Sequence, residues 1–261
     1  MSDTEKINQQ NHAYWTDRAS GYSEVNQEEL AGIQKKTWSD LLDREIRDHF
    51  KIGETHRSRI RILDIGAGPG FLSVILCEQG YQVTAADYAE TMLEEAKQNA
   101  GTLAEKICFR REDAMNLSFP EATFDVVLSR NLTWNLPDPQ RAYEEWLRVL
   151  KHNGLLLIFD ANWYAYLKDE DKRKAYENDR QIVKEQGYED YNIGEGFDIM
   201  EEIAKDLPLT GIIRPQWDEE IFREQKVSSV SCVEDIGSQV YSEKEKTNYS
   251  STPLFMIKVV K

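Results

Sequence analysis

The sequence contains few residues that could crosslink a chain or hold a metal ion. Its three cysteines, Cys77, Cys108 and Cys232, lie far apart and form no C-x-x-C pair. The four histidines are scattered and lack the spacing of metal ligands. These patterns argue against a disulfide framework and against a zinc site. The apolar surroundings of Cys77 and Cys108 predict that both side chains pack in the core.

Long apolar runs and an excess of positive charge are also missing. No stretch approaches the length of a membrane span, and residues 1–10 are polar with mixed charge, so we expect a cytoplasmic protein. The chain has 32 Lys and Arg against 47 Asp and Glu, which gives a net charge of −15. Such a surface repels phosphate backbones and anionic lipids. We therefore expect a small-molecule substrate and neither a nucleic acid nor a membrane as partner.

The middle of the chain alternates predicted strands with predicted helices. The strands cover residues 60–64, 82–87, 106–110, 124–129 and 155–160, and the helices cover 71–78, 90–99 and 139–150. This alternation is typical of a parallel sheet with helices on both faces. After a helix over 217–225, strands at 226–233 and 253–260 follow without a helical crossover and predict an antiparallel pair at one edge. The predicted fold is an α/β, doubly wound, mostly parallel seven-stranded sheet.

Helical segments are expected on both sides of this core along the chain. We predict an N-terminal helical lid over residues 1–58, a cofactor-binding core over 59–161, a helical insertion covering the substrate over 162–208, and the C-terminal part of the sheet over 209–261. Tyr14, Trp15, Arg18 and Tyr22 form an aromatic and basic cluster in the first segment. That cluster suits a helix packed on the edge of the domain and a lid over a cofactor equally well.

A glycine-rich turn follows the first predicted strand. Asp64, Gly66, Gly68 and Gly70 form the pattern D-x-G-x-G-x-G between that strand and an apolar helix. Glycine permits positive φ, and backbone N–H groups at such a turn can hold a nucleotide-like cofactor. A dinucleotide fold would place its third glycine at position 71, which is Phe here. An NAD(P)-linked oxidoreductase is therefore the alternative rather than the leading interpretation.

The turn resembles the first motif of class I S-adenosylmethionine-dependent methyltransferases. Three more segments, at residues 87–93, 112–115 and 116–127, extend the resemblance over about residues 60–160. They are similar to the small-molecule branch of that family, the ubiquinone-biosynthesis-like enzymes. The resemblance implies a Rossmann-like fold, S-adenosyl-L-methionine as cofactor, S-adenosyl-L-homocysteine as product, and in-line methyl transfer to a small molecule. A cofactor-binding regulator without catalysis is a further alternative.

The resemblance also implies roles for individual residues. Asp87 ends the second strand and would accept hydrogen bonds from two ribose hydroxyls, which suits the lone pairs of a carboxylate. Met92 would pack on the adenine, Asp64 would pair with the ammonium of the methionine part, and Asn131 would hold the same end or the substrate. The predicted cofactor-binding residues are Tyr22, Asp64, Gly66, Ala67, Gly68, Asp87, Tyr88, Met92, Asp113, Ala114, Met115 and Asn131.

The acceptor should lie where the fourth and fifth strands end and the insertion folds over them. Because the sulfonium is already activated, the protein mainly aligns the reactants and excludes water, and the pattern identifies no catalytic base. An aromatic and acidic cover could suit a cationic or amine acceptor. The substrate candidates are Arg130, Trp134, Asn135, Asp160, Asn162, Trp163 and Tyr164.

Overall fold

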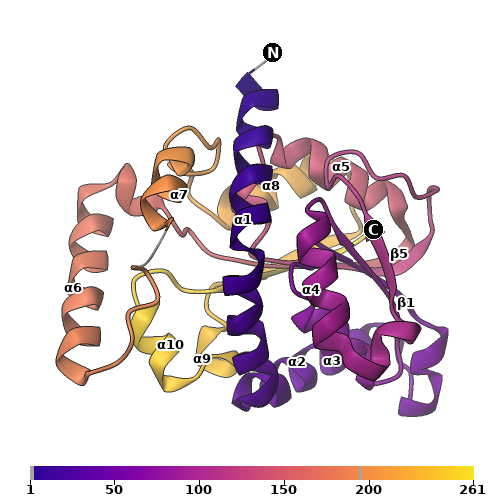
Figure 1. Ribbon diagram of the computed structural model, residues 1–261. Coiled ribbons are helices and arrows are strands. Elements are labelled where there is room, and N and C mark those ends of the chain that lie inside the picture. The colour runs from indigo at the N-terminus through magenta and orange to yellow at the C-terminus, as the bar shows by residue number, and fades with distance from the viewer. Residues whose placement is uncertain (1–2, 194–195) are drawn as a thin grey trace.

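A seven-stranded sheet forms the centre of the protein. The computed structural model describes residues 3–193 and 196–261 (Figure 1). The order of the strands is β3-β2-β1-β4-β5-β7-β6, with β1 to β5 parallel and β7 antiparallel to both of its neighbours. The strands are β1 (Arg61–Ile65), β2 (Gln82–Asp87), β3 (Cys108–Arg111), β4 (Phe124–Arg130), β5 (Leu150–Asp160), β6 (Ser229–Val233) and β7 (Phe255–Val260). The predicted α/β fold is therefore confirmed.

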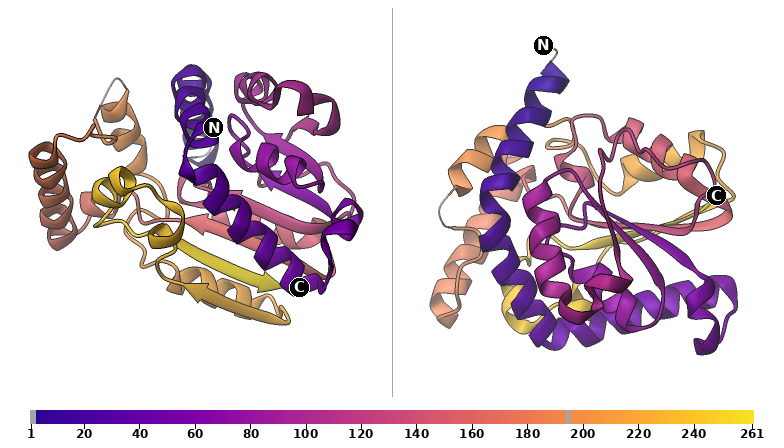
Figure 2. Two further views of the ribbon diagram at one scale, coloured as in Figure 1. Left: turned by 90° about the horizontal axis from the view of Figure 1, so that it is seen from below. Right: turned by 45° about the vertical axis from the view of Figure 1, so that its right-hand side comes forward.

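Helices surround this sheet (Figures 1 and 2). None of them, within the two described ranges, is long and apolar enough to cross a membrane. The α-helices are α1 (Asp3–Ala31), α2 (Ile33–Phe50), α3 (Phe71–Glu78), α4 (Glu90–Ala100), α5 (Pro139–Val149), α6 (Glu170–Gln186), α7 (Phe197–Ala204), α8 (Gln216–Glu224), α9 (Gly237–Val240) and α10 (Glu243–Asn248). Short 3₁₀ turns are η1 (Glu54–Arg59), η2 (Gly101–Lys106), η3 (Thr133–Asn135) and η4 (Ala165–Leu167).

The core has two halves because successive side chains of a strand point to opposite faces of the sheet. Ile62 and Val126 pack on one face with residues of α2 and α3. Their neighbours Leu63 and Val127 pack on the other face with residues of α5 and α8. Strands buried on both faces read as continuous apolar runs, and that property made them visible in the sequence.

The order of the strands opens a crevice at the carboxyl end of β1. The chain passes from β1 to β2 on one side and later returns to place β4 on the other side. In open α/β sheets a ligand binds in such a crevice, beyond the carboxyl ends of the strands. The fold therefore brings the segments that follow β1, β2, β3 and β4 to one place.

Some details differ from the sequence-based predictions. The connection between β6 and β7 contains α9 and α10, which the sequence analysis did not predict, although the antiparallel pairing is confirmed. Of the two strands in this pair, only β6 lies at an edge of the sheet, because β7 is inserted between β5 and β6. The predicted burial of Cys77 is confirmed, but that of Cys108 is wrong. Cys108 begins β3, the other edge strand, and its side chain is exposed there.

Helix α1 runs across the molecule at the carboxyl end of the sheet (Figures 1 and 2). It packs against α2, α3, α4 and α7, so it touches both the core and the segment after β5. The predicted lid at 1–58 and insertion at 162–208 correspond to α1 to η1 and to η4, α6 and α7, apart from residues 1–2 and 194–195, which lie outside the described ranges. The roles of these two segments as a lid and as a substrate cover remain predictions.

Candidate active site

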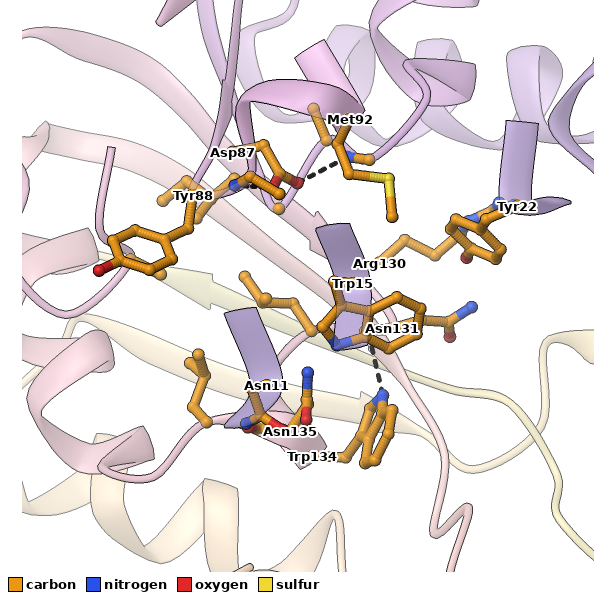
Figure 3. A pocket seen from close by; sticks show the side chains of 18 of the residues that line it. Asn11, Trp15, Tyr22, Asp87, Tyr88, Met92, Arg130, Asn131, Trp134 and Asn135 are labelled. Carbon is orange, nitrogen blue, oxygen red and sulfur yellow. Dashed lines mark hydrogen bonds between the residues drawn. The ribbon is translucent and has the colours of Figure 1, made fainter. Parts of the chain in front are cut away.

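A cavity of about 280 Å³ lies at the carboxyl ends of β1 to β4, beside α1 (Figure 3). All twelve residues predicted to bind the cofactor line it. They come from α1, from β1 and the glycine turn after it, from the end of β2 and the start of α4, and from the segments that follow β3 and β4. The fold thus gathers in one cavity residues that are more than 100 positions apart in the chain.

The glycine turn after β1 disfavours side chains at two positions. Gly66 and Gly68 have φ angles of 65° and 52°, which favour glycine. A Cβ on Gly66 would lie 2.8 Å from the δ-methyl groups of Leu132, and one on Gly68 would lie 3.4 Å from the ring of Tyr22. The main chain of the turn therefore approaches both the cavity and α1 closely.

Asp87 connects the end of β2 to this turn. One carboxylate oxygen accepts a hydrogen bond from the Gly68 N–H at 2.9 Å, and the other accepts one from the Ala89 N–H at 2.9 Å. Burial raises the pKa of Asp87, while these backbone N–H groups lower it. Each carboxylate oxygen can accept more than one hydrogen bond, so Asp87 keeps capacity for a ligand.

Asp64 lies deeper, at the end of β1. Its side chain is 1% exposed and accepts a hydrogen bond from Ser73 Oγ at 2.6 Å. Burial raises the pKa of Asp64 to about 6, even though Ser73 and Arg130 act in the opposite direction. A cation placed beside this carboxylate would favour its charged form.

Arg130, at the end of β4, is held on several sides. Its two terminal nitrogens bind the carboxylate of Glu29 at 2.8 Å each. The guanidinium lies 4.7 Å from the ring centre of Phe71 and 5.3 Å from that of Trp38. The salt bridge raises the pKa of Arg130, against the opposing effect of burial. Arg130 lines the cavity, but Glu29 already uses the geometry with which it would bind a carboxylate.

The segment after β3 forms another wall of the cavity. Asp113 accepts a hydrogen bond from the Met115 N–H at 2.9 Å, and the carbonyl of Ala114 accepts one from Trp146 Nε1 at 3.0 Å. Met92, from α4, is 2% exposed and packs with Ala19 of α1 while it lines the cavity. Met92 therefore belongs both to a small hydrophobic cluster and to the cavity wall.

Helix α1 contributes lining residues that the sequence analysis did not select as site residues. They recur at intervals of three or four positions or multiples of them, so they share one face of the helix. Asn11 Nδ2 donates to the carbonyl of Asn135 at 2.7 Å, and the Phe71 N–H donates to Asn26 Oδ1 at 3.2 Å. The helical spacing of the asparagines was the available signal. The additional lining residues are Asn8, Asn11, His12, Trp15 and Asn26.

Five of the seven substrate candidates line the cavity, namely Arg130, Trp134, Asn135, Trp163 and Tyr164. Asp160 and Asn162 do not line it. Asp160 is fully buried, binds Arg214 at 2.7 Å and accepts a hydrogen bond from the Trp134 N–H at 3.0 Å. Asn162 Nδ2 donates to the carbonyl of Arg214 at 2.9 Å. The structure thus places Asp160 behind η3 and Asn162 against the backbone of Arg214.

Several buried polar atoms of the cavity wall have no hydrogen-bond partner. The side-chain oxygens of Asn11, Asn131 and Asn135 are in this state, as is Nε1 of Trp163. Buried polar groups are nearly always paired, so an unpaired set in a cavity points to a ligand. Asn131 also has a φ of 57°, and its carbonyl accepts a hydrogen bond from Trp134 Nε1 at 3.0 Å.

Comparisons with known proteins agree with this geometry. Residues 63–158 match the family model described as "Methyltransferase domain". A demethylmenaquinone methyltransferase of Clavibacter sepedonicus is 38% identical over 99 residues, which cover 38% of this chain and 40% of that protein. A ubiquinone biosynthesis O-methyltransferase of Coxiella burnetii is 32% identical over 108 residues, or 41% of this chain and 46% of that protein. The chain thus spans less than half the length of these relatives.

A solved structure from Methanococcus maripaludis shares the fold over nearly the whole chain. That protein is assigned to the S-adenosyl-L-methionine-dependent methyltransferases; it is 19% identical, with a TM-score of 0.57, over 92% of this chain and 91% of its own. Residues 63–158 are therefore similar to a methyltransferase domain, and the chain shares its fold with that solved structure. The relatives that match this domain are named for small-molecule reactions, which confirms the predicted family resemblance. The oxidoreductase alternative gains no support.

Proposed function

We propose that this protein transfers the methyl group of S-adenosyl-L-methionine to a small-molecule acceptor. The main support is the convergence of the glycine turn, Asp87 and Asp113 on one cavity within the methyltransferase domain. These features follow three neighbouring strands, β1, β2 and β3.

The cavity fits a nucleoside that carries an amino-acid part. Asp87 would bind the ribose hydroxyls, and Asp113 with the backbone at Ala114 and Met115 would bind the edge of the adenine beside Met92 and Tyr88. Asp64, Asn131 and Tyr22 would face the methionine part. The buried, unpaired Oδ1 of Asn131 has the character needed to accept a hydrogen bond from an ammonium group.

The bound cofactor would supply a methyl group already activated by its sulfonium. The residues around it would then hold the acceptor in line and keep water away from the reacting atoms. Helices α1 and α7 pack against each other, and both contribute residues to the cavity wall, so they can exclude solvent from it.

Calorimetric titration tests the cofactor assignment. We expect tight binding of S-adenosyl-L-homocysteine and no binding of NADH, and the opposite result would contradict the proposal. Asp87→Ala should weaken binding of S-adenosyl-L-homocysteine by about 1.5–3 kcal/mol, the range for hydrogen bonds to a charged group. Asp171→Ala removes a carboxylate that is almost fully exposed on α6 and is the matched control. Equal affinities of the two variants would mean that the nucleoside lies elsewhere.

If the protein were a regulator that binds the cofactor without catalysis, we would expect a different result. It would bind S-adenosyl-L-homocysteine but would leave a metabolite extract unchanged. We expect instead that the purified protein with labelled S-adenosyl-L-methionine adds one methyl group to a small molecule of the extract, detectable by mass spectrometry. We also propose a cytoplasmic location, which fractionation of cells tests directly.

A further inference from the structure

The part of the cavity farthest from Asp87 has its own chemical character. Figure 3 shows Asn11, Trp134 and Asn135 together at one end, with Asp87, Tyr88 and Met92 at the other. We call this first end the acceptor chamber and assign to it residues from α1, from η3, from the segment after β5, from the start of α7 and from the residue after α10. They are Asn11, Trp15, Trp134, Asn135, Trp163, Tyr164, Phe197 and Tyr249.

Among its described residues, the acceptor chamber has no group suited to remove a proton. Among the described residues that line the cavity, the carboxylates are Asp64 in β1, Asp87 at the end of β2, and Glu112 and Asp113 after β3, and none of them belongs to the chamber. His12 packs its ring against Tyr88, with ring centres 4.8 Å apart, so it belongs to the nucleoside end. Burial raises the pKa of the Tyr164 and Tyr249 phenols far above neutrality, so both stay protonated. An acceptor must therefore react without losing a proton to the protein first.

The part of the chamber that the structure describes also has no free cationic side chain that would neutralise an anion. Arg130 is the described arginine that lines the cavity, and Glu29 occupies both of its terminal nitrogens. A buried carboxylate, phosphate or phenolate would thus remain without a counter-ion, which is costly. Phenols and quinols become strong nucleophiles only on deprotonation, so they suit this chamber poorly.

The chamber offers two unpaired hydrogen-bond acceptors, one unpaired donor at Nε1 of Trp163, and several aromatic faces. The side-chain oxygens of Asn11 and Asn135 are buried without a partner, so a ligand with N–H groups would satisfy them. Trp134 lies between two other rings of the chamber, 6.5 Å from Trp15 and 5.1 Å from Tyr164 between ring centres. Aromatic rings attract a positive charge that develops nearby.

Resting on the proposed function, we propose that the acceptor chamber binds a primary or secondary amine in its neutral form and that the amine nitrogen is methylated. The nitrogen lone pair forms the new bond to the methyl carbon while the carbon–sulfur bond breaks and its electron pair stays on sulfur. The product is a methylated ammonium, which later loses its extra proton to water. The amide oxygens and aromatic rings would stabilise the charge as it appears on nitrogen, so no side-chain base is needed.

Calorimetry on the full-length protein saturated with S-adenosyl-L-homocysteine tests the chamber without turnover. The probes are benzylamine and tryptamine, with p-cresol and 5-hydroxyindole as hydroxyl counterparts and benzoate and indole-3-acetate as anions. We expect at least one amine to bind about tenfold or more tightly than its counterparts of similar size. Tighter binding of a phenol or an anion, or no amine binding at all, would overturn the inference. Failure of S-adenosyl-L-homocysteine itself to bind would instead contradict the proposed function.

Variants at Asn135 test whether the amine binds in the acceptor chamber. Asn135→Leu should weaken amine binding about tenfold while binding of S-adenosyl-L-homocysteine, which reports correct folding, stays within about twofold. Asn135→Asp should bind the ammonium form more tightly and shift the pH dependence of methyl transfer to higher pH, because the carboxylate holds the proton on the amine. The control is Asp171→Ala, which should change neither quantity. Unaltered amine binding by Asn135→Leu would overturn the assignment.

Discussion

Asp64 is an acidic residue with almost no contact with solvent. Its pKa rises from 3.8 to about 6 in the folded protein because burial disfavours the charged carboxylate. In the unfolded chain the group ionises at lower pH, so ionisation favours unfolding. The folded state therefore loses stability at this residue as the pH rises from about 4 to about 6, and the full loss persists above that range.

Asp64→Asn removes this pH dependence because an amide does not ionise. We expect the free energy of unfolding of the wild type to fall relative to that of the variant by up to ~3 kcal/mol between pH 4 and pH 7, since one pKa unit corresponds to about 1.36 kcal/mol. Urea denaturation of both proteins at several pH values measures the difference. A constant difference across that range would show that Asp64 has an ordinary pKa.

For individual residues, the sequence predicted the site residues at strand ends. It did not reveal residues whose role depends on a tertiary contact. Asp87 and Asp113 were recognisable because a carboxylate after a predicted strand has a defined place in a parallel sheet. The pairing of Asp160 with Arg214, 54 positions away, has no local signature. Asp160 therefore looked like a candidate for substrate binding, whereas the structure places it behind η3.

Helix α1 makes buried polar contacts near its carboxyl end, in addition to its packing along the rest of its length. Asn26 accepts a hydrogen bond from the backbone of Phe71, and Glu29 forms the paired contact with Arg130. Both Glu29 and Arg130 are largely buried. The position of α1 over the cavity thus depends on an ion pair that is protected from water.

Glu29→Ala should destabilise the protein by about 3–5 kcal/mol, because Arg130 would remain buried without its counter-ion. Glu24, on the same helix, is exposed, and Glu24→Ala should change the free energy of unfolding by less than about 0.5 kcal/mol. Chemical denaturation of the two variants measures both values. Similar stabilities would mean that the ion pair contributes little.

The elements themselves were predicted with unequal success for a physical reason. Buried parallel strands such as β1 and β4 carry runs of apolar residues and stand out from their surroundings. The role of α1 was harder to recognise because its cavity face carries asparagines rather than aliphatic residues. An amphipathic pattern identifies a helix that covers a core, but it does not identify one that covers a polar cavity.

The whole molecule should respond to the cofactor product as a single unit, because the cavity joins segments from α1 to α10. A ligand that binds only the folded state raises the free energy of unfolding by about 2.7 kcal/mol at a concentration of 100 Kd. We expect S-adenosyl-L-homocysteine to raise the melting temperature accordingly. Asp87→Ala should show a smaller increase at the same ligand concentration. An equal increase in both proteins would indicate binding outside the cavity.

The contact of Asp160 with Arg214 and with the backbone of Trp134 has a consequence for how related proteins could diverge. Arg214 binds Asp160 behind the wall that carries Trp134 and Asn135, and no residue from 209 to 225 lines the cavity. Substitutions at residues 209–225 can change the shape of the wall that carries Trp134 and Asn135 without changing the glycine turn after β1. A chimera that carries residues 209–225 of a related protein should therefore methylate the substrate of that related protein. Its affinity for S-adenosyl-L-methionine should stay that of the parent chain.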